Sequence, residues 1–309
     1  MKTNIFKLTA ILIAVIALST AGCKKDDDND DNSNTNSLQQ LSKDGVAVGN
    51  ATGDVMKDAN SILSGGSGKT LYDLPCNVTI DSTNIVNDTI TYSITYDGLN
   101  CDGTLLREGN AEVKKNVNTH WSDAGAKVSI EYIALKITRV SDNKFVIING
   151  SVTYENVTGG YLTQLGTIYT TITHKASGVI YAAFDDNSTS TWHIARQITY
   201  SGAAGSYVIT GDGFGSADGY SNLECWGVNR DGENFYSQIT QSIVLKEACG
   251  WDPCSGIIIH DIPSELKKAT VSFGYDDNNQ LITNGDCPTR FRFDWDVNGN
   301  SGTLYLQLH

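Results

Sequence analysis

Apolar residues recur at two different periods along this chain, and the change of period separates a helix from a β-rich body. Between Val48 and Ile62 they return at steps of three and four residues, which is the spacing of one helix face. The pattern stops at the glycine- and serine-rich stretch 64–68, which is typical of a flexible breaker. From Leu71 onward the period is two, as in strands with one side facing water. The clearest such run places on one face Ile90, Tyr92, Ile94 and Tyr96.

Turn residues between these runs favour antiparallel hairpins. Asn-Gly and Asp-Gly pairs tolerate the positive φ that tight hairpin turns require. Such pairs occur at Asp97-Gly98, Asp102-Gly103, Asn149-Gly150, Asp231-Gly232, Asn284-Gly285 and Asn298-Gly299. Within 128–140 the apolar phase shifts near Tyr132, which predicts a β-bulge. We therefore predict an all-β fold, an antiparallel sandwich or open barrel of roughly a dozen strands, with one short N-terminal helix.

The first residues have the features of an export signal. A basic start, an apolar run over 8–18 and small residues up to Gly22 precede Cys23. The apolar run is too short to cross a bilayer as a helix. The leader resembles a lipoprotein signal peptide over 1–22, cleaved so that the Cys23 thiol can be lipidated, although Thr20 stands where leucine is usual. An ordinary secretory signal is the alternative.

The residues after Cys23 predict a tether and a location. Asp, Asn, Ser and Thr dominate 26–37, so we expect 23–40 to be the lipidated cysteine and an acidic disordered tether. Lys24-Lys25-Asp26-Asp27-Asp28 resembles the lysine-plus-acidic export signal of Bacteroidetes surface lipoproteins. That resemblance implies a lipid-anchored protein of the outer membrane, exposed at the cell surface, and a plain solvated tether is the alternative. The remaining segments are a helix and Gly/Ser breaker over 41–66 and a β-rich body over 67–309, which could divide into two halves near 160.

Composition limits the partners. The chain has 309 residues, of which 40% are hydrophobic, and this is enough for a sizeable core. Its net charge is −13, and removal of the leader leaves 20 basic against 35 acidic residues, a net charge of −15. Nucleic acid is therefore not expected as a partner, because binding phosphates requires clustered Lys and Arg. The same charge favours solubility and divalent cations.

Seven cysteines become six once Cys23 is lipidated. An even number in an exported protein predicts disulfides, and six cysteines allow 15 pairings. A zinc site is disfavoured because the nearest two, Cys249 and Cys254, have no matching second pair. We predict no cofactor and the pairs Cys76–Cys101, Cys249–Cys287 and Cys225–Cys254.

Catalytic motifs are weak. Gly68-Lys69-Thr70 lacks the first glycine of a phosphate-binding loop, because that position is Leu63. No Gly-x-Ser-x-Gly nucleophile elbow occurs, and the five histidines are scattered. We therefore lean towards a non-enzymatic role and predict no catalytic residues. Glycosidases need only two carboxylates that the fold brings together, so a carbohydrate-active hydrolase is the alternative.

One acidic segment imitates half of a calcium loop. Asp294, Asp296 and Asn298 have the spacing of its first ligands, but Tyr305 stands where the bidentate acid is expected. Apolar and charged residues alternate through 290–297, which indicates a strand leading into an Asn-Gly hairpin. We interpret the acids as the wet face of that strand, with calcium as the alternative.

Tryptophans are the candidates for sugar stacking. Trp192 and Trp295 are in phase with apolar neighbours on their strands, so we expect them in the core. Trp121, Trp226 and Trp251 lie near turns and cysteines and are left as candidates for a binding surface.

Three short segments resemble a family of uncharacterised Bacteroidetes surface lipoproteins. Residues 101–111 resemble its Cys-x-x-Gly-Arg-x-Gly-like strand start, 148–156 its Gly-Thr-Val-Thr-Asn-like strand, and 249–256 its Cys-Pro-Ser-Gly-like turn. Cys225 and Cys254 look additional to the family, and the Cys287-Pro288-Thr289 step replaces a usual Cys-Asp-Asn. The resemblance implies a location and a β-rich fold without an established activity.

These observations predict a lipid-anchored outer-membrane protein with a binding or structural role at the cell surface. Its partners would be the membrane, through the anchor, and a glycan or another protein. A binding module predicts an exposed aromatic or acidic patch, and a hydrolase predicts two carboxylates in a cleft. An architectural role predicts an uncovered strand edge or an apolar patch.

Overall fold

The computed structural model describes residues 36–63 and 75–308. The leader, Cys23, most of the tether, the Gly/Ser breaker and Gly68-Lys69-Thr70 lie outside the described residues. The helix is α2 (Asn36–Leu63). The strands are β1 (Val78–Val86), β2 (Thr89–Leu99), β3 (Leu105–Asn116), β4 (Ala126–Arg139), β5 (Phe145–Asn156), β6 (Thr171–Phe184), β7 (Thr189–Ser201), β8 (Val208–Gly213), β9 (Gly215–Ala217), β10 (Tyr220–Val228), β11 (Asn234–Lys246), β12 (Pro253–Ile262), β13 (Lys267–Tyr275), β14 (Arg290–Val297) and β15 (Asn300–Gln307).

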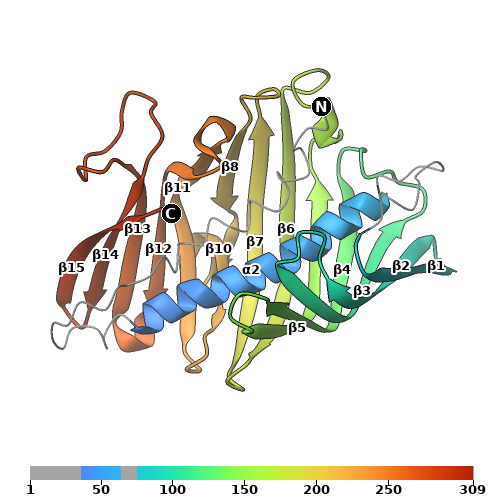
Figure 1. Ribbon diagram of the computed structural model, residues 1–309, viewed down its shortest axis with the longest axis horizontal. Helices are drawn as coiled ribbons and strands as arrows, with labels where there is room; N and C mark the ends of the chain where they lie inside the picture. The colour runs from blue at the N-terminus through green and yellow to red at the C-terminus, as the bar shows by residue number, and fades with distance from the viewer. Residues whose placement is uncertain (1–35, 64–74, 309) are drawn as a thin grey trace.

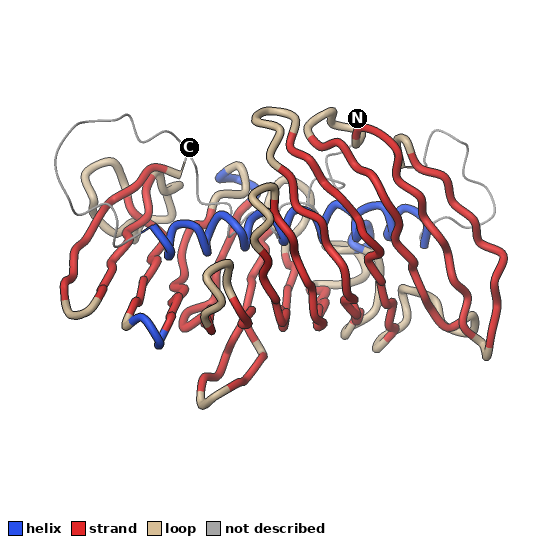
Figure 2. The backbone as a smooth tube through the Cα atoms, turned by 90° about the horizontal axis from the view of Figure 1, so that it is seen from below, coloured by secondary structure: helices blue, strands red, loops and turns tan. Residues whose placement is uncertain are grey.

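All these strands belong to one antiparallel sheet of 15 strands, and α2 crosses one face of it (Figures 1 and 2). Neighbours in the sheet are mostly neighbours in the chain, from β1 at one edge to β15 at the other. Hairpin turns account for this order, because two antiparallel strands joined by a tight turn pair directly. The predicted all-β class with an N-terminal helix is confirmed, and the sheet is open because β1 and β15 do not pair with each other.

The sheet contains one interruption, between β7 and β11. Here β8 fills one end of the gap and β10 fills the other. After Gly213 the chain turns away from β7 and β11 and returns along β10, so that β9 and the start of β10 form a hairpin. This excursion, which we call the β9–β10 hairpin, spans 214–222. It packs on the sheet face opposite α2, where Gly215 lies against the Trp226 ring.

The helix is held by an apolar stripe whose period the sequence already shows. The buried side chains of this stripe are Leu38, Leu41, Val48, Ala51, Val55 and Ala59. Leu38 and Leu41 extend the stripe towards the N-terminus, so the helix begins at Asn36, within the stretch expected to be tether. It is therefore 28 residues long. The burial of these side chains is the main force that holds the helix on the sheet.

A buried ion cluster holds the N-terminal half of the helix. Arg230 donates to both oxygens of Asp44 at 2.6 and 2.7 Å and to Asp186 at 2.8 Å. Its guanidinium lies 3.5 Å from the centre of the Phe184 ring. Burial raises the pKa of Asp44, although Arg230 acts against this. The cluster fixes the position of α2 along the strands.

The pairings of β5 with β4 and with β6 concern two features expected from the sequence. The bulge predicted near Tyr132 is confirmed, since the β4–β5 register shifts between Tyr132 and Leu135. One sheet crosses the point near 160 where a division was considered, because β5 pairs with β6 from Val146 to Asn156. Gly159 and Gly160 instead serve a tight loop with positive φ. The turn residues at the ends of a strand do not reveal which strands its backbone hydrogen bonds join.

Two of the three predicted disulfides are confirmed, Cys76–Cys101 and Cys249–Cys287. The third pair is wrong, because Cys225 and Cys254 are free. Cys225 of β10 pairs with Ser237 of β11. Cys254 lies in the part of β12 that pairs with Val244 and Leu245 of β11. These positions on β11 are about 23 Å apart along the strand, whereas the two Cα atoms of a disulfide lie within about 7 Å. Burial raises the pKa of the Cys225 thiol to about 12, so this thiol stays protonated.

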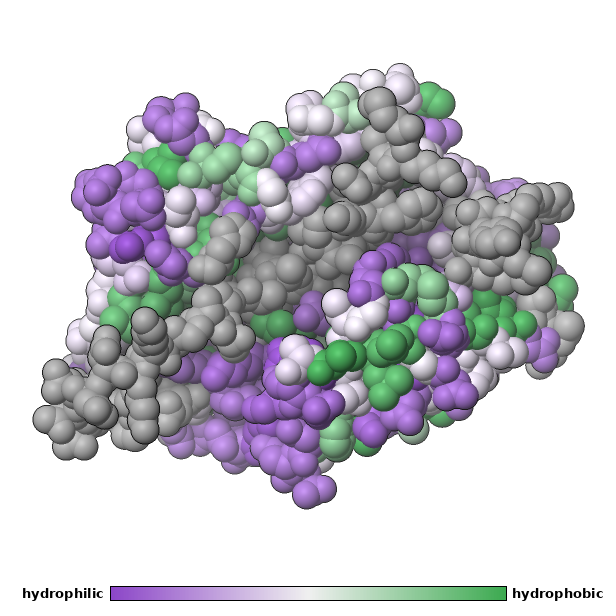
Figure 3. Space-filling model, viewed as in Figure 1, coloured by the Kyte–Doolittle hydropathy of each residue, from purple (hydrophilic) through white to green (hydrophobic). Residues whose placement is uncertain are grey.

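The surface seen from the helix face carries a polar corner. Figure 3 shows hydrophilic residues in purple at the upper left, where Figure 1 places the loop between β13 and β14. This loop contains Asp276, Asp277, Asn278, Asn279, Asn284 and Asp286. Cys287 in this loop is bonded to Cys249, so the loop is tied to the end of β11. No helix in the described ranges 36–63 and 75–308 is long and apolar enough to cross a membrane.

Candidate functional site

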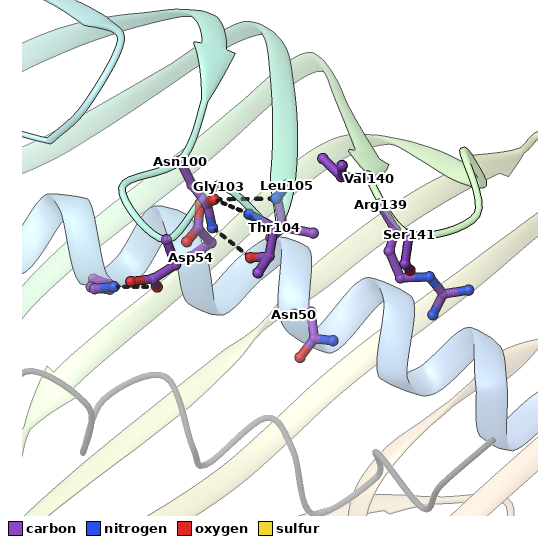
Figure 4. Close-up of a pocket in the computed structure, with 11 residues that line it drawn as sticks. Asn50, Asp54, Asn100, Gly103, Thr104, Leu105, Arg139, Val140 and Ser141 are labelled. Atoms are coloured by element: carbon purple, nitrogen blue, oxygen red, sulfur yellow. Dashed lines mark hydrogen bonds and ion pairs between the residues drawn. The ribbon is translucent and has the colours of Figure 1, made fainter. Parts of the chain in front are cut away.

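A cleft of about 610 Å³ lies where the C-terminal half of α2 meets the turns at one end of the sheet. Three segments line it: α2 through Asn50, Asp54 and Lys57, the β2–β3 turn through 100–105, and the β4–β5 turn through 139–141. Figure 4 shows these segments around the cleft. Ligand pockets in proteins typically have volumes of about 300–1,000 Å³. The cleft is therefore large enough for a small organic ligand.

The β2–β3 turn is a rigid wall of the cleft. The Asn100 side-chain oxygen accepts hydrogen bonds from the backbone N–H of Thr104 at 2.9 Å and of Leu105 at 3.1 Å. Its amide also donates to the Thr104 hydroxyl at 3.2 Å (Figure 4). Gly103 takes a φ of 69°, which the turn requires and glycine permits. The neighbouring disulfide of Cys101 fixes the turn from outside.

A buried ion cluster underlies the cleft. Arg107 of β3 is 1% exposed and donates through Nη1 to Asp54 at 2.7 Å and to Asp58 at 2.6 Å. Its Nη2 donates to the Cys76 carbonyl at 2.8 Å, and its guanidinium lies 4.7 Å from the centre of the Tyr96 ring. The cluster joins helix, sheet and the segment before β1. The floor of the cleft is therefore fixed before any ligand arrives.

The electrostatics of this cluster follow from burial. Burial raises the pKa of Asp58 to about 6, with Arg107 acting against the shift and Asp54 adding to it. Burial also disfavours the charge on Arg107, but Asp58 and Asp54 outweigh it and raise the pKa of the guanidinium. Arg107 is therefore always charged, and one of its two partners changes charge in the mildly acidic range.

Charged, amide and hydroxyl groups stand among the residues that line the cleft, and their charges balance. Asp54 and Asp102 contribute negative charge, and Lys57 and Arg139 contribute positive charge. Lys57 contacts Asp102 at 3.4 Å, and Arg139 donates to Asp142 at 2.5 and 2.8 Å. Asn50 is exposed and contacts the same space with an uncharged amide. Amides, hydroxyls and balanced charges suit a neutral ligand that both donates and accepts hydrogen bonds.

A second cavity lies under α2, between the helix and β5–β7. It measures about 60 Å³, and its walls include Met56, Tyr154, His174 and Arg196. His174 is buried, its Nε2 has no hydrogen-bond partner among the described residues, and burial lowers its pKa to about 4. A buried water needs about 10–15 Å³ of such space. The cavity therefore suits a few water molecules and is too small for a sugar.

The fold brings two carboxylates together, as the hydrolase alternative requires. Asp54 and Asp58 both accept from the same Arg107 nitrogen. That guanidinium occupies the space between them, where a glycosidase would place its substrate. Only Asp54 lines the cleft, and Asp58 is 7% exposed. This geometry favours a role in holding α2.

The acidic segment 294–298 is a strand and a turn, as interpreted from the sequence. Asp294 accepts from Arg292 at 2.9 Å and from the Thr303 hydroxyl at 2.5 Å. Asp296 accepts from the backbone N–H of Gly299 at 3.0 Å. Asn298 and Gly299 both have positive φ and form the β14–β15 turn. Across 36–63 and 75–308, no group of three or more His, Cys, Asp or Glu side chains is arranged to hold a metal ion.

Most of the tryptophans pack in or against the apolar clusters, and Trp226 stacks on a histidine of the neighbouring strand. Trp192 is 3% exposed, which confirms its core position, and Trp295 is half-buried against the core. Trp121 is also buried, at 6% exposed, and Trp251 packs half-buried against a second apolar cluster. Trp226 stacks on His193 with ring centres 5.2 Å apart.

The rings near Trp226 hold the β9–β10 hairpin. Tyr220 stacks on Tyr236 at 4.2 Å and donates to Asp261 at 3.0 Å. Tyr236 donates to Asp218 in the hairpin at 2.5 Å. The rings and carboxylates are thus paired with one another. This arrangement explains the aromatic cluster as an anchor for the hairpin.

Sequence reasoning missed the cleft and the cluster beneath it. One signal was available, since Asp58 falls within the apolar stripe of α2 between Val55 and Ala59. An acid on a buried helix face requires a cation from elsewhere in the fold. Nothing in the local sequence of β3 marks Arg107 as that cation.

Comparison with known proteins does not add to this site. The chain matches no protein-family model, no curated protein and no solved structure.

Proposed function

We propose that this protein is a lipid-anchored binding protein of the outer membrane, carried at the cell surface. The anchor rests on the lipoprotein-type leader and Cys23, and the location rests on the Lys24–Asp28 motif and the family resemblance. The binding role rests on the cleft beside α2. Its ligand is a small, neutral, hydroxyl-rich molecule such as a short glycan.

The observation that carries the binding role is a rigid cleft of ligand size. A volume of about 610 Å³ lies within the range of ordinary ligand sites. Its walls are fixed by the Asn100 turn and the Arg107 cluster, so little ordering is needed when a ligand binds. The position of Arg107 between Asp54 and Asp58 favours binding over hydrolysis.

Cys23→Ser is expected to release the protein from the membrane. The substitution removes the thiol that carries the acyl chains, and their buried methylenes each contribute about 0.8 kcal/mol to attachment. Fractionation of cells should move the variant from the membrane to the soluble fraction. Protease added to intact cells should digest the wild type if it faces outward. An unchanged membrane fraction would contradict lipidation at Cys23.

Ligand binding in the cleft is expected to raise the melting temperature of the full-length protein. A ligand at about 100 times its Kd stabilises the folded state by about 2.7 kcal/mol. A panel of short glycans and, separately, divalent cations should therefore give an upward shift of a few degrees with one sugar class. The measurement is a thermal melt in mild detergent under oxidising conditions.

A pair of matched variants locates the site. Asn50→Trp places a large side chain at the mouth of the cleft and should abolish the shift. Lys43→Trp puts the same side chain on an exposed position of α2 outside the cleft and should keep it. A flat panel with the wild type, or equal loss in both variants, would refute the cleft as a glycan site.

A further inference from the structure

The last strand of the sheet is an edge that no described strand covers. β15 lies at one end of the sheet (Figure 1) and pairs with β14 on one side. Within the described part of the chain, no other strand pairs with its outer side. Leu304 and Leu306 are 46% and 38% exposed. An exposed edge with apolar side chains is a template for pairing with another strand.

β15 lacks the features with which proteins protect such edges. Its sequence, Asn-Ser-Gly-Thr-Leu-Tyr-Leu-Gln, contains no proline and no charged residue. The opposite edge strand, β1, has two features that discourage pairing with another strand. It carries Asp81, and its register with β2 shifts between Asp81 and Asn84. Charges and irregular registers discourage edge pairing, so the two edges are not equivalent.

The hairpin geometry shows which backbone groups of β15 point outward. A two-residue turn, Asn298-Gly299, joins Val297 to Asn300, which form the closing pair of the hairpin. Hydrogen-bonded and non-hydrogen-bonded pairs alternate from that point. Asn300, Gly302, Leu304 and Leu306 therefore direct their backbone groups to β14. Ser301, Thr303 and Tyr305 direct theirs away from the sheet.

We propose that β15 pairs antiparallel with β15 of a second copy of this chain, about a two-fold axis at Tyr305. The outward N–H and C=O of Tyr305 would then bond to those of Tyr305 of the partner subunit. Leu304 would lie opposite Leu306 of the partner subunit, and Leu306 opposite the partner's Leu304. Both exposed leucines of each copy are thereby covered in one register.

Self-complementarity selects a second copy over an unrelated strand. Antiparallel pairing about a two-fold axis places the same strand on both sides, so a charged residue near the axis would lie close to the like charge of the second copy. β15 has no charge, although the whole chain has a net charge of −13. Apolar residues directly opposite one another in a non-hydrogen-bonded pair are in close contact. The exposed leucines and the absence of charge thus fit the same partner.

Sedimentation velocity of the full-length protein in mild detergent tests the pairing. The wild type is expected to shift from monomer to dimer as its concentration rises. Leu304→Lys with Leu306→Lys places cations opposite each other and should raise the dimer dissociation constant at least tenfold. Ile85→Lys with Val86→Lys changes two exposed apolar residues of β1, 61% and 57% exposed, and should leave the dimer intact.

Cysteine cross-linking tests the register and decides the case if the lysine variant fails to fold. Leu304→Cys combined with Leu306→Cys should give a covalent dimer on a non-reducing gel, because the thiol at position 304 of each copy faces the thiol at position 306 of the other. Leu304→Cys alone should give much less. A wild type that stays monomeric at every concentration, or a dimer lost in the β1 variant only, would overturn the proposal.

Discussion

Replacement of Arg107 by methionine is expected to lower the free energy of unfolding by about 3–5 kcal/mol, the usual cost of removing one partner from a buried ion pair. Asp54 and Asp58 would lose their shared cation while they remain on the face of α2 that meets the sheet. Methionine keeps the bulk of the arginine stem, so the loss reports the charge. Urea denaturation followed by circular dichroism measures it.

The controls for Arg107→Met separate buried from exposed charge. Arg139→Met breaks an ion pair with Asp142 whose side chains are 48% and 38% exposed, and should cost less than about 1 kcal/mol. Asp54→Asn and Asp58→Asn, added to Arg107→Met, should restore much of the lost stability, because no uncompensated charge remains. Equal losses for Arg107→Met and Arg139→Met would contradict this account.

The effect of Arg107→Met should also depend on pH. The pKa of Asp58 is about 6 in the folded protein against an ordinary value of 3.8. A pKa raised by folding means that the contribution of Asp58 to stability is full below the ordinary pKa and is lost as pH rises through about 6. The destabilisation should therefore be smaller at about pH 5 than at about pH 7.5, because the Asp58 carboxyl is largely protonated at the lower pH.

Removal of the Cys249–Cys287 disulfide should cost about 4 kcal/mol, the chain-entropy value for a loop of this length. The bridge closes a separation of 38 residues and ties the loop between β13 and β14 to the end of β11. The paired substitutions Cys249→Ser and Cys287→Ser avoid leaving a free thiol. A thermal melt should show a fall of many degrees in the melting temperature.

Cys254→Ser is the matched control for the disulfide variant, since Cys254 is free and half-buried. We expect it to change the melting temperature little. A wild type whose melting temperature is the same with and without reductant would argue that the bridge is not formed. A loss in Cys254→Ser as large as in the paired variant would contradict the assigned pairing.

Local sequence patterns determined the elements of this protein. The steps of three and four residues from Val48 to Ile62 lie within α2, and the period of two after Leu71 lies in the sheet. The phase shift near Tyr132 became a bulge in β4. The alternation through 290–297 became β14. Each of these patterns reports contacts between residues close in the chain, so no knowledge of the fold is needed to interpret it.

Partners distant in the chain were decided only by the tertiary structure. The sequence left open whether the strands form a sandwich or an open barrel, because the period of two marks a buried face and not what covers it. The pairing of Cys225 with Cys254 failed because strand register, not cysteine number, sets the distance between them. Trp226 was a candidate for binding until its stacking on His193 was known.

The candidate site belongs to this second class. Asp58 on the buried face of α2 indicated that a cation must lie beside it, but Arg107 lies 49 residues away in the chain. The cleft above them is formed by α2 and two hairpin turns that meet only when the helix lies across the sheet. Periodicity determined the helix, the strands and the faces that are buried. Which buried face meets which depends on the packing of the whole sheet, and the cleft exists only as a product of that packing.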